Sequence, residues 1–414
     1  MSDHSEFRPS KLGEISRPRQ WPTISQEVMR EAGLHPVYGA NGVIGFYNSY
    51  THERPTVAIT CRGSTCGEIH LTPEKSYITG NAMALDDLDR SRLDQRYLYH
   101  FLKRDGLKDC ITGSAQPQII GSALKDFLVW HPPLESQRTI AAILDTLDTQ
   151  IQKTEALIAK LEKVKEGLLH DLLTRGIDEN GQLRPSPEQA PELYKDSPLG
   201  TIPREWTSQR LGEVVSFKGG VGFPERAQGK KHGDFPFYKV SDMSIPGNEK
   251  LMRKANNYVT NSVAKGLGAT PIAPRSVVFA KVGAALLLNR RRLLSTSSLL
   301  DNNMMAATAT MGVHPEFLYW WMTRVDFGLL VQPGALPSIN QSQMEKITIG
   351  LPPETEQRLI SSRLETHDAL IENKKRELPI LNSLKSGLMD DLLTGRVRVT
   401  PLLEQAQAQG TTPA

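Results

Sequence analysis

The chain has 414 residues, of which 39% are apolar, and its formal net charge is +3. This length predicts two to three domains, and the apolar content is sufficient for their cores. The polar first residues predict no signal peptide, and no apolar run approaches the roughly 18 residues of a membrane span. Three cysteines give no disulfide framework, and Cys61 and Cys66 lack a second pair for zinc, so we expect a reduced cytoplasmic protein.

Positive charge is distributed unevenly along the chain. Residues 211–350 hold 16 Lys/Arg and 9 Asp/Glu, a net +7, whereas residues 7–131 hold 15 and 13, a net +2. The remaining residues sum to −6. An excess of cations in one segment indicates a polyanionic partner there, although a solvated basic surface would have the same composition.

Residues 1–131 are expected to form the first globular segment, a mixed α/β domain. Asn41-Gly42 between apolar flanks predicts a hairpin with a type I′ turn, which needs positive φ at both positions. Strands are predicted at 56–60, 68–71 and 127–130, and a short helix at 97–103. Residues 62–65, Arg-Gly-Ser-Thr, form a small polar turn after the first of these strands.

Two features of this segment have more than one interpretation. Gly39, Gly42 and Gly45 have a spacing that fits neither a dinucleotide fingerprint nor a P-loop, so a hairpin is favoured over a phosphate loop. Arg62 in its Gly/Ser/Thr turn suits a phosphate or base-edge contact, and it equally suits a solvated turn arginine.

The segment 132–178 is predicted to be one long helix. After Pro132-Pro133, apolar residues recur in alternating four- and three-residue steps, which is the heptad pattern of a coiled coil. Thr154 and Lys165 interrupt this apolar seam. About 36 helical residues would span about 54 Å, so the helix needs a partner along its length.

A second copy of this helix lies at 352–397. The stretches 132–174 and 352–394 align without a gap at an offset of 220, with 17 of 43 positions identical. Lys374 and Lys385 interrupt its seam where Thr154 and Lys165 interrupt the first, and His367 is a third interruption. Pro379 is expected to kink this copy. An antiparallel pair would allow each helix to bury its seam on the other.

The segments between the helices repeat more weakly. A proline-rich stretch at 179–205 is expected to be an extended linker. The second globular segment, 206–351, restarts as the first does, with Leu211-Gly212-Glu213 matching Leu12-Gly13-Glu14 and about 21 residues inserted further on. Residues 398–414 are expected to be a disordered tail. The whole chain is therefore a tandem duplication of a domain followed by a helix.

Catalytic motifs are absent from the sequence. We find no P-loop, no HExxH, no GxGxxG opening a helix, and no Asn/Asp-Pro-Pro-Tyr/Phe motif of amino-methyltransferases. The sequence therefore favours a binding protein that gives specificity to another protein.

The chain resembles the specificity (S) subunit of type I restriction–modification systems. PVYGANGVIG, TCRGSTCG, TGNAMAL and the two helical copies carry the resemblance, which covers nearly the whole chain. It implies an α+β fold with two mixed α/β target-recognition domains, separated by two long antiparallel coiled-coil helices in an internal pseudo-twofold repeat. It further implies a non-catalytic, DNA-sequence-recognition role in a bacterial or archaeal cytoplasm, with each domain reading one half of a bipartite site. The sequence recognised and the spacer length are not given by it.

The same resemblance implies the partners and the contact residues. The helices would set the spacing between half-sites and dock two methyltransferase (M) subunits, and restriction (R) subunits would join. S-adenosylmethionine, ATP and Mg would be bound by those partners, with no cofactor or metal on this chain. Expected at double-stranded DNA are Asn41, Arg62, Ser64, Thr65, Lys75, Lys218, Lys230, Lys231, Lys239, Arg253, Lys254, Arg290, Arg291 and Arg292. Expected in the spacer helices and their docking are Gln137, Arg138, Ile140, Leu144, Leu147, Ile151, Leu161, Leu168, Leu172, Gln357, Arg358, Ile360, Leu364, Ile371, Leu381, Leu388 and Leu392.

Two other functions are compatible with parts of the sequence. A fused methyltransferase–nuclease would require a catalytic motif, which this sequence lacks. A structural adaptor, in which the coiled coil joins two protein-binding domains, would require no salt-sensitive DNA binding.

Overall fold

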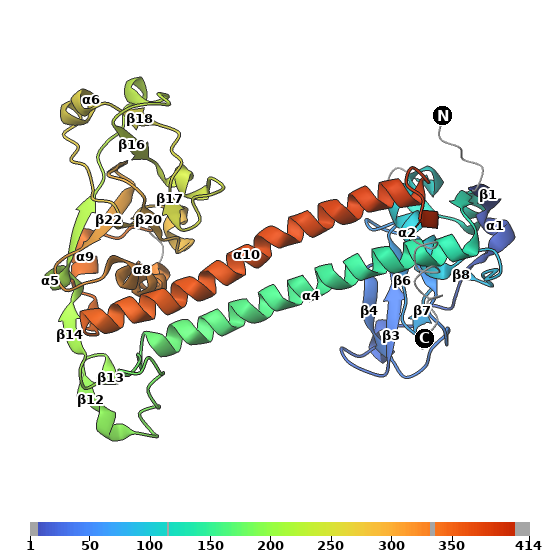
Figure 1. Cartoon of the computed structure of the whole chain (residues 1–414), viewed down its shortest axis with the longest axis horizontal. Coiled ribbons are helices and arrows are strands. Elements are labelled where there is room, and N and C mark those ends of the chain that lie inside the picture. Colours follow the sequence, from blue (N-terminus) through green and yellow to red (C-terminus); the bar gives the residue numbers. More distant parts are fainter. Residues whose placement is uncertain (1–6, 114–115, 332–335, 402–414) are drawn as a thin grey trace, which may run out of the picture. The chain divides into compact units, whose positions relative to one another are not determined.

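The computed structural model describes residues 7–113, 116–331 and 336–401 (Figure 1). The chain divides into two compact units. Unit 1 comprises Met1–Leu157 and Lys374–Ala414, and unit 2 comprises Ile158–Asn373. Each unit thus contains one globular domain, called domain 1 or domain 2 below, and one part of each long helix.

Domain 1 is built from small sheets and short helices. Its sheets have the strand orders β2-β8-β5-β6, β4-β3-β7, β10-β9 and β1-β11. The strands are β1 (Arg8–Lys11), β2 (Arg17–Gln20), β3 (His35–Gly39), β4 (Gly42–Tyr47), β5 (Val57–Thr60), β6 (Ile69–Leu71), β7 (Tyr77–Ile78), β8 (Ala82–Asp86), β9 (Ile111–Thr112), β10 (Gln118–Ile119) and β11 (Leu128–His131). The helices are α1 (Leu12–Ile15), α2 (Gln95–Asp105) and α3 (Gly121–Lys125). The expected strands and the expected helix are therefore confirmed.

The hairpin of β3 and β4 is confirmed, but its turn differs from the prediction. Gly39 pairs with Gly42, so the two-residue loop is Ala40-Asn41 rather than Asn41-Gly42. Gly42 has a φ of +71°, whereas Asn41 is not among the described residues with positive φ. A type I′ turn is therefore excluded, and glycine supplies the left-handed residue just after the loop.

Domain 2 repeats this arrangement with a larger sheet. Its sheets have the orders β15-β22-β19-β20-β17, β18-β16-β21 and β14-β23. The strands are β14 (Thr207–Arg210), β15 (Val215–Gly219), β16 (Phe235–Tyr238), β17 (Leu251–Met252), β18 (Tyr258–Val259), β19 (Val277–Ala280), β20 (Arg292–Leu294), β21 (Leu299–Leu300), β22 (Met304–Ala309) and β23 (Thr348–Leu351). The helices are α5 (Leu211–Val214), α6 (Asn261–Gly266), α7 (Ala284–Leu287), α8 (Pro315–Thr323) and α9 (Gln341–Glu345).

The two long helices are α4 (Leu134–Leu172) and α10 (Glu354–Leu393), and α10 continues through Pro379. In unit 1 the first turns of α4 and the last turns of α10 share one core, through Ile140, Leu144, Leu392 and Leu393. In unit 2 the last turns of α4 and the first turns of α10 share the other. The helices therefore run antiparallel within each unit, as expected from their seams.

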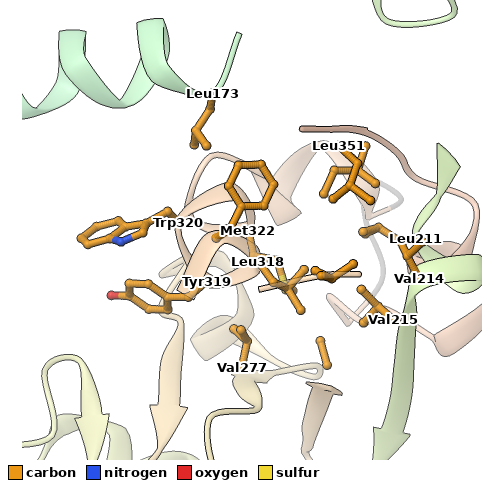
Figure 2. Close-up of a cluster of buried hydrophobic side chains, with 14 of the residues drawn as sticks. Leu173, Leu211, Val214, Val215, Val277, Leu318, Tyr319, Trp320, Met322 and Leu351 are labelled. Carbon is orange, nitrogen blue, oxygen red and sulfur yellow. The ribbon is translucent and has the colours of Figure 1, made fainter. Parts of the chain in front are cut away.

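The ends of the long helices are buried in the domain cores. In unit 2, Leu173, the residue after α4, belongs to the same buried cluster as Trp320 and Met322 of α8 (Figure 2). Seam residues Ile360 and Leu364 of α10 are also in this cluster and are fully buried. Each helix terminus is thus held by burial of apolar area in a domain core rather than by helix propensity alone.

The stretch expected to be an extended linker is folded instead. It contains a hairpin of β12 (Tyr194–Ser197) and β13 (Gly200–Pro203). Before the hairpin, the Arg184 guanidinium donates to both carboxylate oxygens of Glu356 at 2.5 and 3.0 Å. The indole of Trp206 donates to the same carboxylate at 3.2 Å. Proline content indicated an irregular backbone, but this tertiary contact with α10 fixes its path.

The predicted disordered tail, 398–414, lies outside the described residues from 402 onward. Of its first four residues, Val399 is 2% exposed and belongs to the core of unit 1.

Two residues expected in the spacer helices and their docking lie on those helices, with side chains internal to their units. The side chains of Gln137 and Gln357 are fully buried. The Gln137 amide accepts from the backbone N–H of Asp94 and donates to the Pro132 carbonyl, at 2.7 and 2.8 Å. Gln357 makes the equivalent bonds with His314 and Pro352, both at 2.8 Å. Their identity in the two copies reflects attachment of a domain to its helix.

We expect Gln357→Ala to destabilise unit 2 by about 2–3 kcal/mol, because it leaves buried backbone groups unpaired. The adjacent Arg358→Ala is the matched control, since its side chain is 60% exposed and pairs with Glu354 one turn away. That control should change the free energy of unfolding by less than about 0.5 kcal/mol. Denaturant unfolding of the full chain measures both, and equal effects would contradict the role given to Gln357.

Candidate nucleic-acid interface

In domain 1, four of the residues predicted to contact DNA lie together. Thr65 donates to the side chain of Asn41 at 3.2 Å and to the backbone carbonyl of Ala40, which joins the 62–65 turn to the hairpin tip. Arg62 and Ser64 are exposed on the same turn. A cation, a hydroxyl and an amide thus form one polar surface that suits phosphate and base-edge contacts.

The frame beneath this turn is made by the backbone. Arg62 forms an isolated β-bridge with Gln118, and the N–H of Gly63 donates to the Pro117 carbonyl at 3.3 Å. Gly63 has a φ of +88° and no atom near the position of a Cβ. Backbone atoms therefore hold the frame, while the side chain of Arg62 is exposed above it.

A histidine and a lysine missed by the sequence analysis adjoin this surface. His70 lies beneath Gly42, where a Cβ would lie 3.2 Å from the imidazole. Burial lowers the pKa of His70, so its ring is neutral near pH 7. His70 and Lys103 both line a surface cavity of about 420 Å³. No short-range pattern links β6 with the end of α2, so only the fold brings these residues together.

Lys75 does not join the other domain 1 candidates. It precedes β7, which runs parallel to β3 with Tyr77 opposite Val37. Asn41 follows the other end of β3, so the two side chains lie at opposite ends of this sheet. Lys75 is exposed, with a φ of +55°, and its N–H donates to the Glu53 carbonyl.

In domain 2, a buried polar pair organises several of the predicted cations. Asp242 and Asn248 are both fully buried. The amide of Asn248 donates to the backbone carbonyls of Asp242 and Lys254 at 2.8 and 2.7 Å. Its oxygen accepts from the N–H groups of Arg253 and Lys254 at 2.9 and 3.0 Å. We call these two residues the Asp242–Asn248 pair.

The same pair reaches the neighbouring basic turns. The carboxylate of Asp242 accepts from the backbone N–H of Lys239 at 2.7 Å and from the Asn256 amide at 2.8 Å. The Lys231 ammonium in turn donates to the Asn256 carbonyl at 3.4 Å. Five cations lie on the segments joined by these bonds or next to them: Lys230, Lys231, Lys239, Arg253 and Lys254. Of these, Lys239 is half-buried and the others are exposed.

The arginine run at 290–292 is only partly a surface feature. Arg290 donates to the Ser244 hydroxyl at 2.6 Å, close to the Asp242–Asn248 pair. Arg292 is half-buried and donates to the Met243 carbonyl at 3.2 Å, and burial lowers its pKa. These two arginines therefore lie beside the basic turns around the Asp242–Asn248 pair.

Arg291 was expected at DNA, and the structure contradicts this. Its side chain is 2% exposed and lies over the Phe327 ring, 3.6 Å from its centroid. Its guanidinium donates to the Asn289 side chain at 3.0 Å and to the Val325 carbonyl. Burial lowers its pKa to about 10, a value at which it remains charged at neutral pH. Arg291 therefore stabilises the core of unit 2 and cannot reach a phosphate.

Lys218 lies apart from the basic turns, on β15 in the five-stranded sheet. Its ammonium donates to the Thr270 carbonyl at 3.4 Å. Beside it, the ammonium of Lys281 is 3.1 Å from the Cβ position of Gly219. The sequence analysis missed Lys281, which follows β19 as Cys61 follows β5 in domain 1.

Residues 4–163 and 203–381 match the family model "Type I restriction modification DNA specificity domain". The chain belongs to this family. It is 25% identical over 356 residues to the type I restriction enzyme MjaVIII specificity subunit of Methanocaldococcus jannaschii, a match that covers 82% of this chain and 78% of that protein. It is 23% identical to a putative specificity subunit of Haemophilus influenzae, with 85% of each chain covered.

A solved structure shares the fold of this specificity protein. The S subunit of a type I restriction–modification system from M. genitalium matches with a TM-score of 0.65 and 17% identity, covering 93% of this chain and 96% of that one. The predicted α+β architecture with two recognition domains and two long helices is therefore confirmed. Membership of the specificity family assigns the chain a role in DNA recognition rather than in catalysis.

Metal ligation and membrane insertion find no support in the described part of the specificity protein. Residues 7–113, 116–331 and 336–401 contain no group of three or more His, Cys, Asp or Glu side chains placed to hold a metal ion. Within the same residues, no helix has the length and apolarity needed to cross a membrane.

We expect Asn248→Ala to weaken DNA binding about tenfold, because Arg253 and Lys254 lose the bonds that fix their backbone. The matched control is Asn261→Ala, an exposed asparagine of domain 2 whose side chain bonds to Asp234. Titration of a target duplex with each variant measures the difference. A loss shared equally by both variants would exclude a specific role for the Asp242–Asn248 pair.

Proposed function

We propose that each recognition domain of this specificity subunit reads one half of a bipartite DNA site. One observation carries the proposal: the two domains present different side chains on the same backbone frame. In domain 2, Val282 bridges Ser338, and the Gly283 N–H donates to the Pro337 carbonyl at 2.7 Å. These contacts repeat those of Arg62 and Gly63 at an offset of 220.

The side chains on this frame differ in chemistry. Arg62 and Ser64 of domain 1 correspond to Val282 and Ala284 of domain 2. Domain 2 carries its cations on the turns around the Asp242–Asn248 pair instead. A shared frame with unlike contact residues supports recognition of two different half-sites, which together form an asymmetric sequence.

The long helices supply the second part of the proposal, which is spacing and docking. We infer that their length sets the separation of the half-sites and that their outer faces bind two methyltransferase subunits. Val164 of α4 and Leu384 of α10 occupy equivalent positions and are 47% and 49% exposed. Equivalent exposed apolar side chains on two helices suit two copies of one partner.

Restriction subunits would complete the complex, in which the partners bind S-adenosylmethionine, ATP and Mg and perform adenine methylation and ATP-dependent cleavage. A structure with 16% identity and a TM-score of 0.53 to this chain comes from work on "complex assembly" and "conformational transition" of a type I system. That likeness concerns the fold, and assembly of this chain with such partners is part of the proposal.

Salt dependence tests the DNA-binding part. We expect the affinity for duplex DNA to fall steeply as the salt concentration rises. Replacement of Arg253 and Lys254 by Gln should make the plot of log affinity against log salt concentration less steep, by about one for each phosphate that is no longer neutralised. Lys195→Gln is the control, because Lys195 is exposed on β12 of the linker hairpin. A flat response of the wild-type chain with its methyltransferase subunits would favour the structural adaptor.

Helix length tests the spacing part. One heptad inserted at equivalent positions of both α4 and α10 lengthens the pair by about 10.5 Å, so we expect the spacer to grow by about three base pairs. Insertion into both helices keeps their seams in register. Methylation mapping in cells that express the complete complex measures the site, and an unchanged spacer would contradict the proposal.

A further inference from the structure

Two lysines that interrupt the apolar seams have partners across the helix pair. Lys385 of α10 forms an ion pair with Asp148 of α4 in unit 1. Lys165 of α4 forms an ion pair with Asp368 of α10 in unit 2. Asp148 and Asp368 are 220 positions apart, as are Lys165 and Lys385. The second pair is therefore the first with the two helices exchanged.

Both pairs are mostly shielded from water. The lysine side chains are 15% and 28% exposed, and the aspartates 26% and 16%. Removing one member would leave a poorly solvated charge without a partner, which costs more than loss of a surface ion pair. Apolar side chains at these positions would pack without specifying a register, whereas paired charges at a helix seam favour one alignment.

The sequence shows that a one-heptad slip cannot preserve both pairs. A slip in one direction places Ala141 and Ser361 opposite the two lysines, so neither lysine has a carboxylate. A slip in the other direction gives Lys385 a new partner in Glu155 but places Lys165 opposite Lys375. Of these three registers, the observed one alone provides an aspartate for each lysine.

Each aspartate is also contacted by its recognition domain. In unit 1, the His100 Nδ1 of α2 is 4.0 Å from Asp148, while its Nε2 bonds to Asp145 at 2.8 Å. In unit 2, Lys250 of domain 2 is 3.4 Å from Asp368 and lies 4.4 Å from the ring centroid of Trp320, the residue equivalent to His100. Each aspartate thus connects the helix that carries it with the other long helix and with the recognition domain of its unit.

We propose that Lys385–Asp148 and Lys165–Asp368 are register locks that fix a single spacing between the two DNA half-sites. These four residues are positioning residues, because they act on recognition through the alignment of the helices and touch no DNA. The inference rests on the proposed role of the helices in spacing, and the alignment itself can be measured without DNA.

The test uses the unit 1 pair in the full chain. Asp148→Lys and Lys385→Asp each create a like-charge pair, and the double variant restores an ion pair with the charges exchanged. The control is the exchange Lys374→Glu with Glu377→Lys. This pair is somewhat more exposed, at 31% and 35%, but lies within α10 and carries no information about register.

Three measurements are made on each variant. In thermal unfolding, the Tm of each single variant should be about 5 °C below that of the wild type, and the Tm of the exchange variant should be close to it. Spin labels at the exposed positions Gln152 and Ser383, with Cys66 replaced by Ser, report the alignment in unit 1. A single distance is expected for wild type and exchange, whereas the single variants should show additional distances from helices displaced along their axes by one heptad, about 10.5 Å. Methylation mapping with the partner subunits should show more than one spacer length for the single variants only.

The outcomes separate the inference from the function on which it rests. An exchange variant as impaired as the single variants, or single variants with one distance and one spacer, would overturn the lock. If the wild-type complex methylates no bipartite site, the proposed function fails, whereas the label distances still decide whether the pairs set the register. A control exchange that broadens the distances would also count against the lock, because it would show that register responds to any charge change in the seam.

Discussion

A long helix with a narrow apolar stripe cannot bury that stripe on itself, and the rest of this structure depends on that constraint. In isolated helices, the apolar seams of the 39-residue α4 and the 40-residue α10 would be exposed to water over their whole length, and helices in proteins gain most of their stability from packing such a face. Duplication supplies each helix with a partner of matching period. A domain core then closes the pair in each unit, through Leu144 and Leu392 in unit 1 and through Leu172 and Leu364 in unit 2.

Polar groups inside these contacts show where geometry matters more than apolar area. A buried ion pair such as Arg184–Glu356 gains little over a well-packed apolar pair, because both charges lose their hydration. The Glu356 carboxylate also accepts from the Trp206 indole and from the backbone N–H of Ile177. One side chain of α10 thus holds three points of the chain between α4 and domain 2. Gln137 and Gln357 do the same between each helix and its domain. Such polar groups therefore fix the positions of the segments that they join.

How much could be predicted from the sequence depended on the range of each signal. The heptad seam and the fixed offset of 220 extend over 43 residues, so local exceptions such as Pro379 do not obscure them. The hairpin of β3 and β4 was found from its turn residues, although the choice between Ala40-Asn41 and Asn41-Gly42 depended on the register of the strands.

The candidate site was less predictable because burial depends on tertiary neighbours. Arg290, Arg291 and Arg292 look alike in sequence, yet only the fold places Phe327 and the Val325 carbonyl around Arg291. The linker was misread because its anchor, Glu356, lies 150 residues or more away.

The division between constant helices and divergent domains follows from where the contacts lie. Around Arg62 and Val282 the stabilising bonds are made by backbone atoms, so these side chains can differ without disturbing the frame. Along the helices the side chains themselves make the stabilising contacts, and a change at Asp148 or Lys385 removes the partner of a shielded charge. Surface side chains can therefore diverge in each domain without disturbing its backbone, whereas paired charges along the helices tolerate less change.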